Sequence, residues 1–367
     1  MFSNFYKGKK VLVTGHTGFK GSWLCQWLLN LGAEAAGFSL YIPSDPSMFE
    51  VLGLDGELKD YRGDVRNLDE LTAVFEEFKP EMVFHLAAQP IVKTSFSDPK
   101  LTFDTNLCGT VNMLEAVRNS SSVKAAIFIT SDKCYENVEW EYGYRETDRL
   151  GGKDPYSASK ACAEIAISAY WRSFLKDSGK VIASARAGNV IGGGDWAENR
   201  IVPDCVRAWE QRKEVVVRNP VATRPWQHVL EPLSGYLWLG ATLLLNTGRS
   251  GGVAGEPFNF GPNADVNQPV KILIESLSEG WDGSAPCKIE EDPLAKTHEA
   301  GLLKLSCDKA LKTLHWKATL NFAETVNMTG EWYQCFYSQK HEMVRFTLEQ
   351  IESYVQLAKQ GGLEWAK

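Results

Sequence analysis

The sequence lacks the cysteine and histidine patterns that mark metal sites and redox motifs. Its eight cysteines are scattered without a C-x-x-C pair, and its six histidines show no H-x-x-x-H or H-E-x-x-H spacing. Zinc sites usually display such spacings, so the sequence predicts no metal site. A large acidic chain with cysteines this dispersed is typical of a reducing compartment, and we expect free thiols.

Long apolar segments and an excess of basic residues are missing as well. Residues 1–15 run from a short polar lead into a strand without the apolar core of a secretory signal. The most apolar later segment, Leu233–Leu245, is too short to span a bilayer. A net charge of -7 gives no overall attraction to nucleic acid or anionic membrane. We therefore expect a soluble cytoplasmic protein without nucleic-acid or membrane partners, in which a local basic pocket can still bind a phosphorylated small molecule.

The sequence does contain a regular alternation of short apolar segments and helical patterns. The expected strands are Lys10–Val13, Ala35–Leu40, Met82–Leu86, Lys124–Ile129 and Val181–Arg186. The expected helices are Ser22–Leu31, Leu68–Phe78, Thr105–Asn119 and Ser157–Phe174. This alternation predicts an α/β fold with a Rossmann-like, doubly wound parallel sheet.

The length of 367 residues, 44% of them hydrophobic, indicates two lobes. After Gly188 the alternation stops, and residues 188–228 are rich in Gly, Pro, Asn and Trp. A helix at Pro232–Leu245 and a strand at Pro257–Phe260 then return to the sheet pattern. We expect a first domain of residues 1–187 plus 229–263. Residues 188–228 plus 264–367 should form a smaller mixed α/β lobe that ends in an amphipathic helix near Met343–Leu357.

Three glycines lie between the first expected strand and its helix. Gly15, Gly18 and Gly21 occur in KKVLVTGHTGFKGSWL. A dinucleotide pyrophosphate requires a tight turn, a close backbone approach and a helix N-terminus with free N–H groups. The alternative, a purely structural turn, does not require this strand–turn–helix context. We therefore predict that the first domain binds NAD through Gly15, His16, Thr17, Gly18, Phe19, Lys20 and Gly21.

The carboxylate that usually binds the adenosine ribose at the end of the second strand is missing. Ser39 stands near that position, and the nearest acid is Asp45 in a proline-containing loop. No arginine is present in this segment to receive a 2′-phosphate, so NAD is favoured over NADP. Its binding is expected to be weak or exchangeable. Asp64 is either an adenine contact or a turn residue.

Tyr156 and Lys160 lie four positions apart in Pro-Tyr-Ser-Ala-Ser-Lys and share one helix face. A neighbouring ammonium favours tyrosinate, so Tyr156 is a candidate base toward a substrate hydroxyl. Lys160 is a candidate partner of the nicotinamide ribose. An ordinary helix surface is the alternative, but the placement after a Rossmann turn favours the catalytic interpretation.

A polar segment follows the apolar strand at 124–129 directly. Ser131, Asp132 and Lys133 stand where parallel sheets bind ligands, beyond the carboxyl end of a strand. Ser131 can hydrogen-bond Tyr156, and Asp132 with Lys133 provides an acid and a base. Without Tyr156, a salt-bridged loop would be the favoured interpretation.

Together these motifs resemble the extended short-chain dehydrogenases/reductases, and specifically the sugar-nucleotide 4,6-dehydratases. The resemblance covers nearly the whole chain. It also includes Gly63-Asp64-Val65, His85-Leu86-Ala87-Ala88-Gln89, the helix with Asn106, Arg186-Ala187-Gly188-Asn189 and Arg224-Pro225-Trp226-Gln227-His228-Val229. Many members carry Thr-Asp-Glu where this chain has Ser131-Asp132-Lys133. That difference, with His16 and the Gly-Gly-Gly-Asp-Trp segment at 192–196, is similar to the branch that acts on CDP-glucose.

The resemblance implies an enzyme with catalytic NAD and a nucleotide-sugar substrate in the second lobe. Tyr156, assisted by Ser131, would take the C4 hydroxyl proton, Lys133 the C5 proton, and Asp132 would protonate the leaving C6 hydroxyl. A basic lysine must be neutral, which an adjacent carboxylate opposes. Further implied NAD contacts are Asp64, Val65, Leu86, Ala87, Ala88, Tyr156 and Lys160, and implied substrate contacts are Gln89, Asn189, Arg200 and Arg224.

Three points stay open. Helices at Thr105–Asn119 and Ser157–Phe174 resemble the dimer helices of the family, which implies a homodimer with a tetramer as alternative. Trp196 and Trp226 are either base-stacking or core residues. The activity could also be a dehydratase of another nucleotide sugar, an epimerase or, remotely, non-catalytic dinucleotide sensing. Asp132 and Lys133 argue against a plain epimerase, which needs no such pair.

Overall fold

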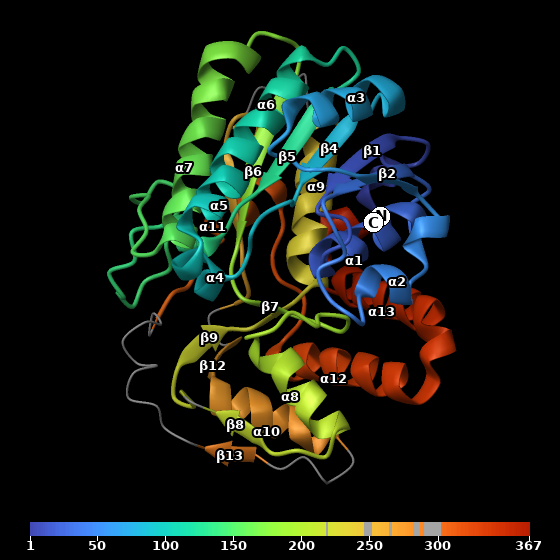
Figure 1. The fold of residues 1–367 in the computed structure, drawn as a ribbon, viewed down its shortest axis with the longest axis vertical. Coiled ribbons are helices and arrows are strands. Elements are labelled where there is room, and N and C mark those ends of the chain that lie inside the picture. Colours follow the sequence, from blue (N-terminus) through green and yellow to red (C-terminus); the bar gives the residue numbers. More distant parts are fainter. Residues whose placement is uncertain (218, 246–251, 264–265, 282–286, 290–301) are drawn as a thin grey trace.

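A seven-stranded parallel sheet forms the centre of the computed structural model (Figure 1), which describes residues 1–217, 219–245, 252–263, 266–281, 287–289 and 302–367. The strand order is β11-β6-β5-β4-β1-β2-β3, and every pairing within it is parallel. The strands are β1 (Lys10–Thr14), β2 (Glu34–Ser39), β3 (Lys59–Arg62), β4 (Met82–His85), β5 (Ala125–Ile129), β6 (Val181–Ala187) and β11 (Pro257–Phe260). The predicted doubly wound sheet is confirmed. Its strand order reverses between β1 and β4, where such sheets bind ligands.

Helices cover both faces of the sheet. One face carries α1 (Phe19–Asn30) and α9 (Leu230–Leu245), with α13 (Met343–Gln360) against α1; the other carries α3 (Leu68–Phe78), α6 (Gly109–Asn119) and α7 (Pro155–Tyr170). Within β1, Val11 and Val13 belong to the first core and Leu12 to the second. This is the two-residue period of a strand buried on both faces, which is why these segments read as continuous apolar runs.

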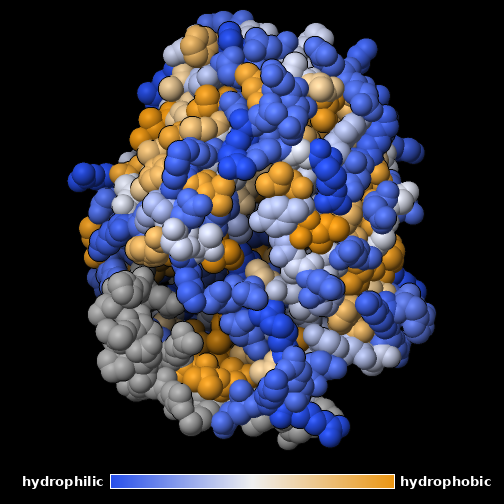
Figure 2. Space-filling model, in the orientation of Figure 1, coloured by the Kyte–Doolittle hydropathy of each residue, from blue (hydrophilic) through white to orange (hydrophobic). Residues whose placement is uncertain are grey.

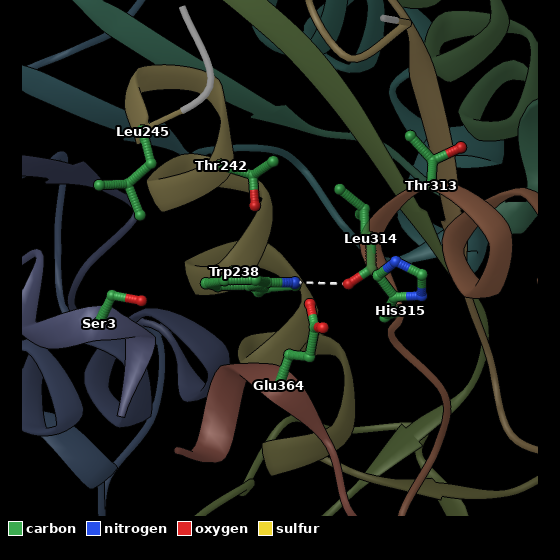
Figure 3. Close-up of a pocket in the computed structure, with 8 residues that line it drawn as sticks. All are labelled: Ser3, Trp238, Thr242, Leu245, Thr313, Leu314, His315 and Glu364. Atoms are coloured by element: carbon green, nitrogen blue, oxygen red, sulfur yellow. Dashed lines mark hydrogen bonds between the residues drawn. The ribbon is translucent and has the colours of Figure 1, made fainter. Parts of the chain in front are cut away.

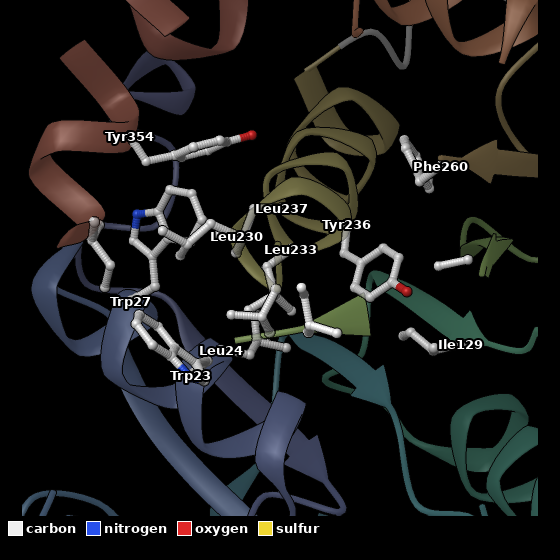
Figure 4. Packing of buried hydrophobic residues seen from close by; sticks show 14 of the residues in the cluster. Trp23, Leu24, Trp27, Ile129, Leu230, Leu233, Tyr236, Leu237, Phe260 and Tyr354 are labelled. Carbon is white, nitrogen blue, oxygen red and sulfur yellow. The ribbon is translucent and has the colours of Figure 1, made fainter. Parts of the chain in front are cut away.

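Two buried tryptophans of α1 pack against neighbouring helices and the segment beyond the sheet. Trp23 and Trp27 are fully buried and lie between the sheet and its outer helices, near Leu233 of α9 and Tyr354 of α13 (Figure 4). The Trp23 Nε1 donates to the Gly193 carbonyl oxygen at 2.9 Å. Because residue 193 belongs to the segment beyond the sheet, this bond ties the start of α1 to the second lobe.

Several helices differ in extent from the prediction. The first begins at Phe19 rather than Ser22, because Gly18 is extended and serves as its N-cap. The helix expected at 105–119 continues from α5 (Pro99–Phe103) through a π-helical turn, η3 (Asp104–Cys108). The helix expected at 157–174 begins two residues earlier, after Asp154 caps it, and ends in a second π-helical turn, η5 (Trp171–Leu175).

Further helices and short strand pairs form a layer beyond the carboxyl ends of the strands, in the lower part of Figure 1. They include α8 (Ile201–Glu210), α10 (Val270–Glu279) and α12 (Phe322–Gln339). Two-stranded pairs join β7 (Val190–Ile191) to β10 (Gln227–His228), β9 (Thr223–Pro225) to β12 (Asn267–Pro269), and β8 (Val215–Val217) to β13 (Cys287–Ile289). The remaining elements are η1 (Phe2–Asn4), α2 (Met48–Val51), η2 (Leu54–Gly56), α4 (Val92–Ser97), η4 (Asp132–Cys134), α11 (Asp308–Leu314), η8 (Lys340–Glu342) and η9 (Glu364–Ala366).

The end of the chain packs back onto the first domain. Helix α13 contacts α1, η9 contacts η1, and the Met1 amine donates to the Lys367 carbonyl oxygen at 2.9 Å. The division into residues 1–187 plus 229–263 and 188–228 plus 264–367 stays a prediction, and residues 343–367 contact the first of these units.

The face shown in Figure 2 mixes hydrophilic and hydrophobic side chains. Within the described ranges, no helix is both long and apolar enough to cross a bilayer.

Candidate active site

The glycine turn has the shape that a dinucleotide pyrophosphate requires. Gly15 has a φ of +72°, and a Cβ there would lie 2.8 Å from the Ala87 nitrogen. A Cβ on Gly21 would lie 2.1 Å from the Gly15 carbonyl oxygen. The first turn of α1 contains no acidic residue, so its unbonded N–H groups favour an anion. The predicted residues 15–21 therefore fit NAD, and Ala87 closes the turn from β4.

A buried histidine organises the adenosine end of this turn. His16 is fully buried; its Nδ1 lies 2.8 Å from the Ser39 Oγ and its Nε2 lies 2.9 Å from Asp60 Oδ1. Burial lowers the pKa of His16, and Asp60 opposes this effect. A Cβ on Gly37 would lie 2.1 Å from the imidazole, so glycine makes room for the ring. The Ser39 hydroxyl is thus engaged within the chain.

Two charged residues of β3 lie at this end and were not predicted from the sequence. Asp60 accepts from Arg62 Nη2 at 2.7 Å, and Arg62 stands opposite Ser39 in the strand register. The signal was the acid and base at alternate positions of Lys-Asp-Tyr-Arg, but so polar a segment gave no apolar strand pattern. Asp60 neutralises Arg62.

The side chains of Asp64 and Gln89 already form hydrogen bonds with other residues of the chain. The Asp64 carboxylate accepts from Arg66 Nε at 2.8 Å, and Arg66 lowers the pKa of that carboxyl. The Gln89 amide donates to Thr102 Oγ1 at 2.9 Å and accepts from the Ile91 N–H at 2.7 Å. These bonds give both residues structural roles, and their contacts with ligands stay predictions.

The other cofactor candidates flank the turn. Val65 is buried in the core beside Gly109, where an added Cβ would approach the Val65 Cγ2 to 2.8 Å. Leu86, Ala87 and Ala88 follow β4, and the Ala87 N–H donates to Thr14 Oγ1 at 3.2 Å. This segment therefore passes directly beside the glycine turn.

An acid and a base meet just beyond β5. Ser131 caps the short helix η4 and donates to Asp132 Oδ1 at 2.9 Å. The Lys133 Nζ lies 3.3 Å from Asp132 Oδ1 and 3.5 Å from Asn189 Oδ1. Asp132 is 2% exposed, and a Cβ on Gly188 would lie 3.1 Å from its Oδ2. The structure thus brings together four predicted residues, which are Ser131, Asp132 and Lys133 of the first predicted domain and Asn189 of the second.

Tyr156 and Lys160 of α7 face the same space. Burial raises the pKa of Tyr156, while the charge of Lys133 and the neighbouring Ser131 hydroxyl lower it. Burial lowers the pKa of Lys160 to about 8, and its Nζ donates to the Ile129 carbonyl oxygen at 3.4 Å. The predicted Tyr–Lys pair therefore lies beside the Ser131–Lys133 turn.

The second lobe and the glycine turn add further cations to this space. The Arg200 Nη1 donates to Asp195 Oδ2 at 2.8 Å, and the Arg200 charge acts on both Tyr156 and Lys20. Burial lowers the pKa of Lys20 to about 7, and the charges of Arg200, Lys160 and Lys133 lower it further. So dense a group of cations suits a phosphorylated ligand.

The remaining candidates of the second lobe lie near its strands. Arg224 is on β9, where its Nη1 donates to the Thr223 carbonyl oxygen at 2.8 Å. Trp196 and Trp226 are both 4% exposed; Trp196 packs 4.8 Å from the Phe336 ring, and the Trp226 Nε1 donates to the Gln268 carbonyl oxygen at 3.0 Å. Both tryptophans are therefore core residues, as the second of the two interpretations has it.

One cavity lies away from these residues. It has about 480 Å³ and is lined by residues that include Trp238 and Thr242 of α9, His315 and Glu364 (Figure 3). Helix α9 runs antiparallel to the strands, so its C-terminal end lies at the edge of the sheet opposite the Ser131–Lys133 turn. No group of three or more His, Cys, Asp or Glu side chains that could hold a metal occurs in the described part of the chain.

Comparison with known proteins gives close relatives. The family model described as GDP-mannose 4,6 dehydratase matches residues 12–329. The CDP-glucose 4,6-dehydratase of Salmonella typhimurium is 43% identical over 357 residues, which cover 96% of this chain and 98% of the relative. The solved UDP-glucose 4-epimerase of Thermus thermophilus in complex with NAD is 26% identical with a TM-score of 0.74, covering 89% of this chain and 99% of that one. The dTDP-glucose 4,6-dehydratase of Streptomyces venezuelae, solved with NAD and TYD bound, has a TM-score of 0.73 at 23% identity and covers 89% and 97%.

Proposed function

The chain belongs to the GDP-mannose 4,6-dehydratase family, and on that premise we propose that it converts CDP-glucose to CDP-4-keto-6-deoxyglucose and water. It is an NAD-dependent nucleotide-sugar hydro-lyase on a Rossmann-like fold. The choice of CDP-glucose follows the relative that is 43% identical over nearly the whole of both chains.

One observation carries the proposal. Asp132 and Lys133 place a carboxylate and an ammonium 3.3 Å apart beside Tyr156 and Lys160. Oxidation at C4 requires only a base and a hydride acceptor, whereas loss of water from C5 and C6 also requires a proton acceptor and a proton donor. The candidate site contains residues of the types that oxidation and loss of water each require.

In this proposal Tyr156 begins the reaction by taking the proton of the C4 hydroxyl. Ser131 supports the tyrosinate by turning its hydroxyl proton from Asp132 to the tyrosine oxygen, and the charges of Lys133 and Arg200 favour the tyrosinate. When bound, NAD supplies the acceptor for the C4 hydride and the donor that returns it to C6. Residues 15–21, with Ala87 and Lys160, would hold the cofactor. The burial that raises the pKa of Tyr156 is opposed by these cations, and the nicotinamide charge adds to them.

The elimination step uses the pair on η4. As an ion pair, Lys133 is protonated and Asp132 is not, which is the reverse of what the step requires. A single proton shift across the 3.3 Å contact produces a neutral amine and a carboxylic acid. Lys133 then takes the C5 proton, made acidic by the C4 ketone, and Asp132 protonates the departing C6 hydroxyl. The ion pair with Asp132 opposes a neutral Lys133, but the same contact also gives the Lys133 proton a path to the Asp132 carboxylate.

We infer that the substrate diphosphate and sugar lie between the lobes. Asn189 contacts Lys133 and starts the second lobe, and Arg200 and Arg224 present planar guanidinium groups suited to phosphate. Gln89 remains a candidate at the sugar. Homodimeric assembly and a cytoplasmic location are also proposals, and the former follows from the family resemblance of α6 and α7.

The test is to incubate the purified protein with CDP-glucose, with and without added NAD. A product lighter by one water, without net NADH, supports the proposal, and dependence on added NAD supports weak cofactor binding. Water loss from dTDP- or GDP-sugars alone would keep the chemistry and overturn the cytidine assignment. A change of C4 configuration without water loss would make the protein an epimerase.

A further inference from the structure

A buried ion pair lies directly behind the candidate catalytic residues. Arg186 Nη2 donates to Glu164 Oε2 at 2.7 Å, and both side chains are 3% exposed. The same carboxylate accepts from Ser184 Oγ at 2.8 Å and from Thr130 Oγ1. Burial alone would raise the pKa of Glu164, but Arg186 and the two hydroxyls hold it below its usual value. Glu164 is therefore an anion with a full set of partners.

The ion pair contacts both ends of the turn that carries Asp132 and Lys133. Thr130, bound by Glu164, directly precedes Ser131. Tyr135, at the other end, follows η4, and its hydroxyl accepts from Arg186 Nη1 at 2.8 Å. The Tyr135 hydroxyl then donates to Asn259 Oδ1 on β11 at 2.8 Å. The turn is thus fixed before its first and after its last residue.

The same carboxylate belongs to the helix that carries the other catalytic pair. Tyr156, Lys160 and Glu164 lie at successive four-residue intervals of α7 and share one face. Glu164 therefore joins α7 to the turn, and Arg186 joins both to β6. The pair thus adds a buried, charged connection to the contacts that Ser131 makes with Tyr156 and Lys160 makes with the Ile129 carbonyl oxygen.

We propose that Glu164 and Arg186 are positioning residues that set the placement of Asp132 and Lys133 relative to Tyr156 and Lys160. The inference rests on the proposed function, because only a dehydratase needs both groups to act in turn on neighbouring carbons of one bound sugar. A displacement of roughly 1 Å can reduce a rate by about a hundredfold. Buried ion pairs contribute little net stability, so a positional role accounts better for keeping one here.

Two single-hydroxyl variants test this inference. Thr130→Val and Ser184→Ala each remove one hydrogen bond to Glu164, but only Thr130 is joined to the turn. We expect T130V to lower kcat for CDP-glucose roughly tenfold or more, with KM within about twofold of wild type, and S184A to stay within about twofold for both constants. Thermal unfolding of both proteins verifies that they are folded.

A single-turnover experiment separates positioning from general damage. T130V removes neither the Tyr156 hydroxyl nor the Ile129 backbone carbonyl that accepts from Lys160 Nζ, so oxidation at C4 should precede a slowed elimination and NADH absorbance should rise transiently. Glu164→Gln also removes the charge that raises the pKa of Lys160, so its loss of kcat should exceed that of T130V and include slower oxidation at C4. Equal losses in T130V and S184A, or a loss without the transient, would overturn the inference. A wild-type enzyme that leaves CDP-glucose unchanged would instead overturn the proposed function, and this inference with it.

Discussion

Tyr156 is buried on α7 beside the Ser131 hydroxyl and within the field of Lys133 and Arg200. These neighbours favour loss of the Tyr156 hydroxyl proton, which affects the rate only if that hydroxyl exchanges a proton during the reaction. Phenylalanine keeps the ring and its packing but removes that hydroxyl. We expect Tyr156→Phe to reduce kcat by about 10²–10⁴-fold with little change in KM or in thermal unfolding. The rate of 4-keto product formation measures this, and a variant that keeps more than about a tenth of wild-type kcat would remove Tyr156 from the role of base.

Asp132 has a different task, and its substitution should leave a different signature. Asparagine can still accept the hydrogen bonds from Ser131 and Lys133 but cannot carry the proton that leaves with the C6 hydroxyl. We expect Asp132→Asn to oxidise bound CDP-glucose, seen as NADH absorbance in proportion to enzyme, and to release almost no dehydrated product. Tyr156→Phe should show neither signal. Dehydration by Asp132→Asn at the wild-type rate would show that the acid lies elsewhere.

At the scale of the elements, helix α9 holds a buried carboxylate far from the proposed chemistry. Glu231 is 1% exposed and accepts from the backbone N–H groups of Thr319 and Leu320, at 2.8 Å and 2.6 Å, and from the Tyr354 hydroxyl at 2.9 Å. Burial raises its pKa to about 7. The side chain thus joins α9 to the 319–320 segment and to α13.

The raised pKa predicts how stability varies with pH. The folded chain binds the Glu231 proton more tightly than the unfolded chain, so this contribution is fully present below about pH 4 and is lost as pH rises through about 7. Glutamine imitates the protonated acid. Glu231→Gln should therefore raise the free energy of unfolding by roughly 1–3 kcal/mol at about pH 8, and by less at about pH 5. Urea unfolding at both pH values measures this.

A matched control comes from the exposed face of α13. Glu352 is exposed, so Glu352→Gln should change stability little at either pH. An equal effect of the two substitutions, or a larger gain for Glu231→Gln at the lower pH, would contradict the assignment.

The elements also show what sequence reasoning could reach. Strands such as β1, β5 and β6 were predicted to within about one residue, because strands buried on both faces are apolar throughout. The π-helical turns η3 and η5 were missed, since an i→i+5 bond depends on local packing that no sequence period encodes. The first and last residues of β3, a short and polar strand, were not predicted. Asp60 and Arg62 were overlooked for that reason.

The residues of the candidate site also fall into those that the sequence could predict and those that it could not. Ser131, Asp132, Lys133, Tyr156 and Lys160 could be identified because each stands at a recognisable place, after a strand or on one face of a helix. Glu164 could not, because its importance depends on partners outside its own helix, which are Arg186 and Ser184 of β6 and Thr130 after β5. Arg186 stood in a quoted motif, but its role required knowing that Tyr135 and Glu164 lie on either side of it.

At the scale of the whole molecule, the two ends of the chain complete one core. Phe2 stacks on Trp365 with ring centroids 5.3 Å apart, and Trp365 also packs against Trp27 of α1 and Tyr354 of α13. All four rings are buried to 0% exposure. Segments separated by the length of the chain therefore share one aromatic cluster behind the cofactor-binding helix.

Loss of the central ring should destabilise the whole fold. Trp365→Ala is expected to lower the free energy of unfolding by about 3–5 kcal/mol, because it leaves a large cavity in that cluster. Trp140→Ala, at a site that is 37% exposed, should cost far less. Chemical unfolding gives both values, and comparable losses would show that the cluster contributes no more than the surface does.

The separation of Tyr156 and Lys160 on α7 from Asp132 and Lys133 on η4 also has an evolutionary consequence. A helix can be inherited unchanged while a three-residue turn diverges, so one ancestral sugar-oxidising scaffold can yield descendants that differ only in the step after oxidation. Epimerases and dehydratases share this fold among the solved structures. On the proposed function, substitution within residues 131–133 would therefore alter the step after oxidation while Tyr156 and Lys160 stay unchanged.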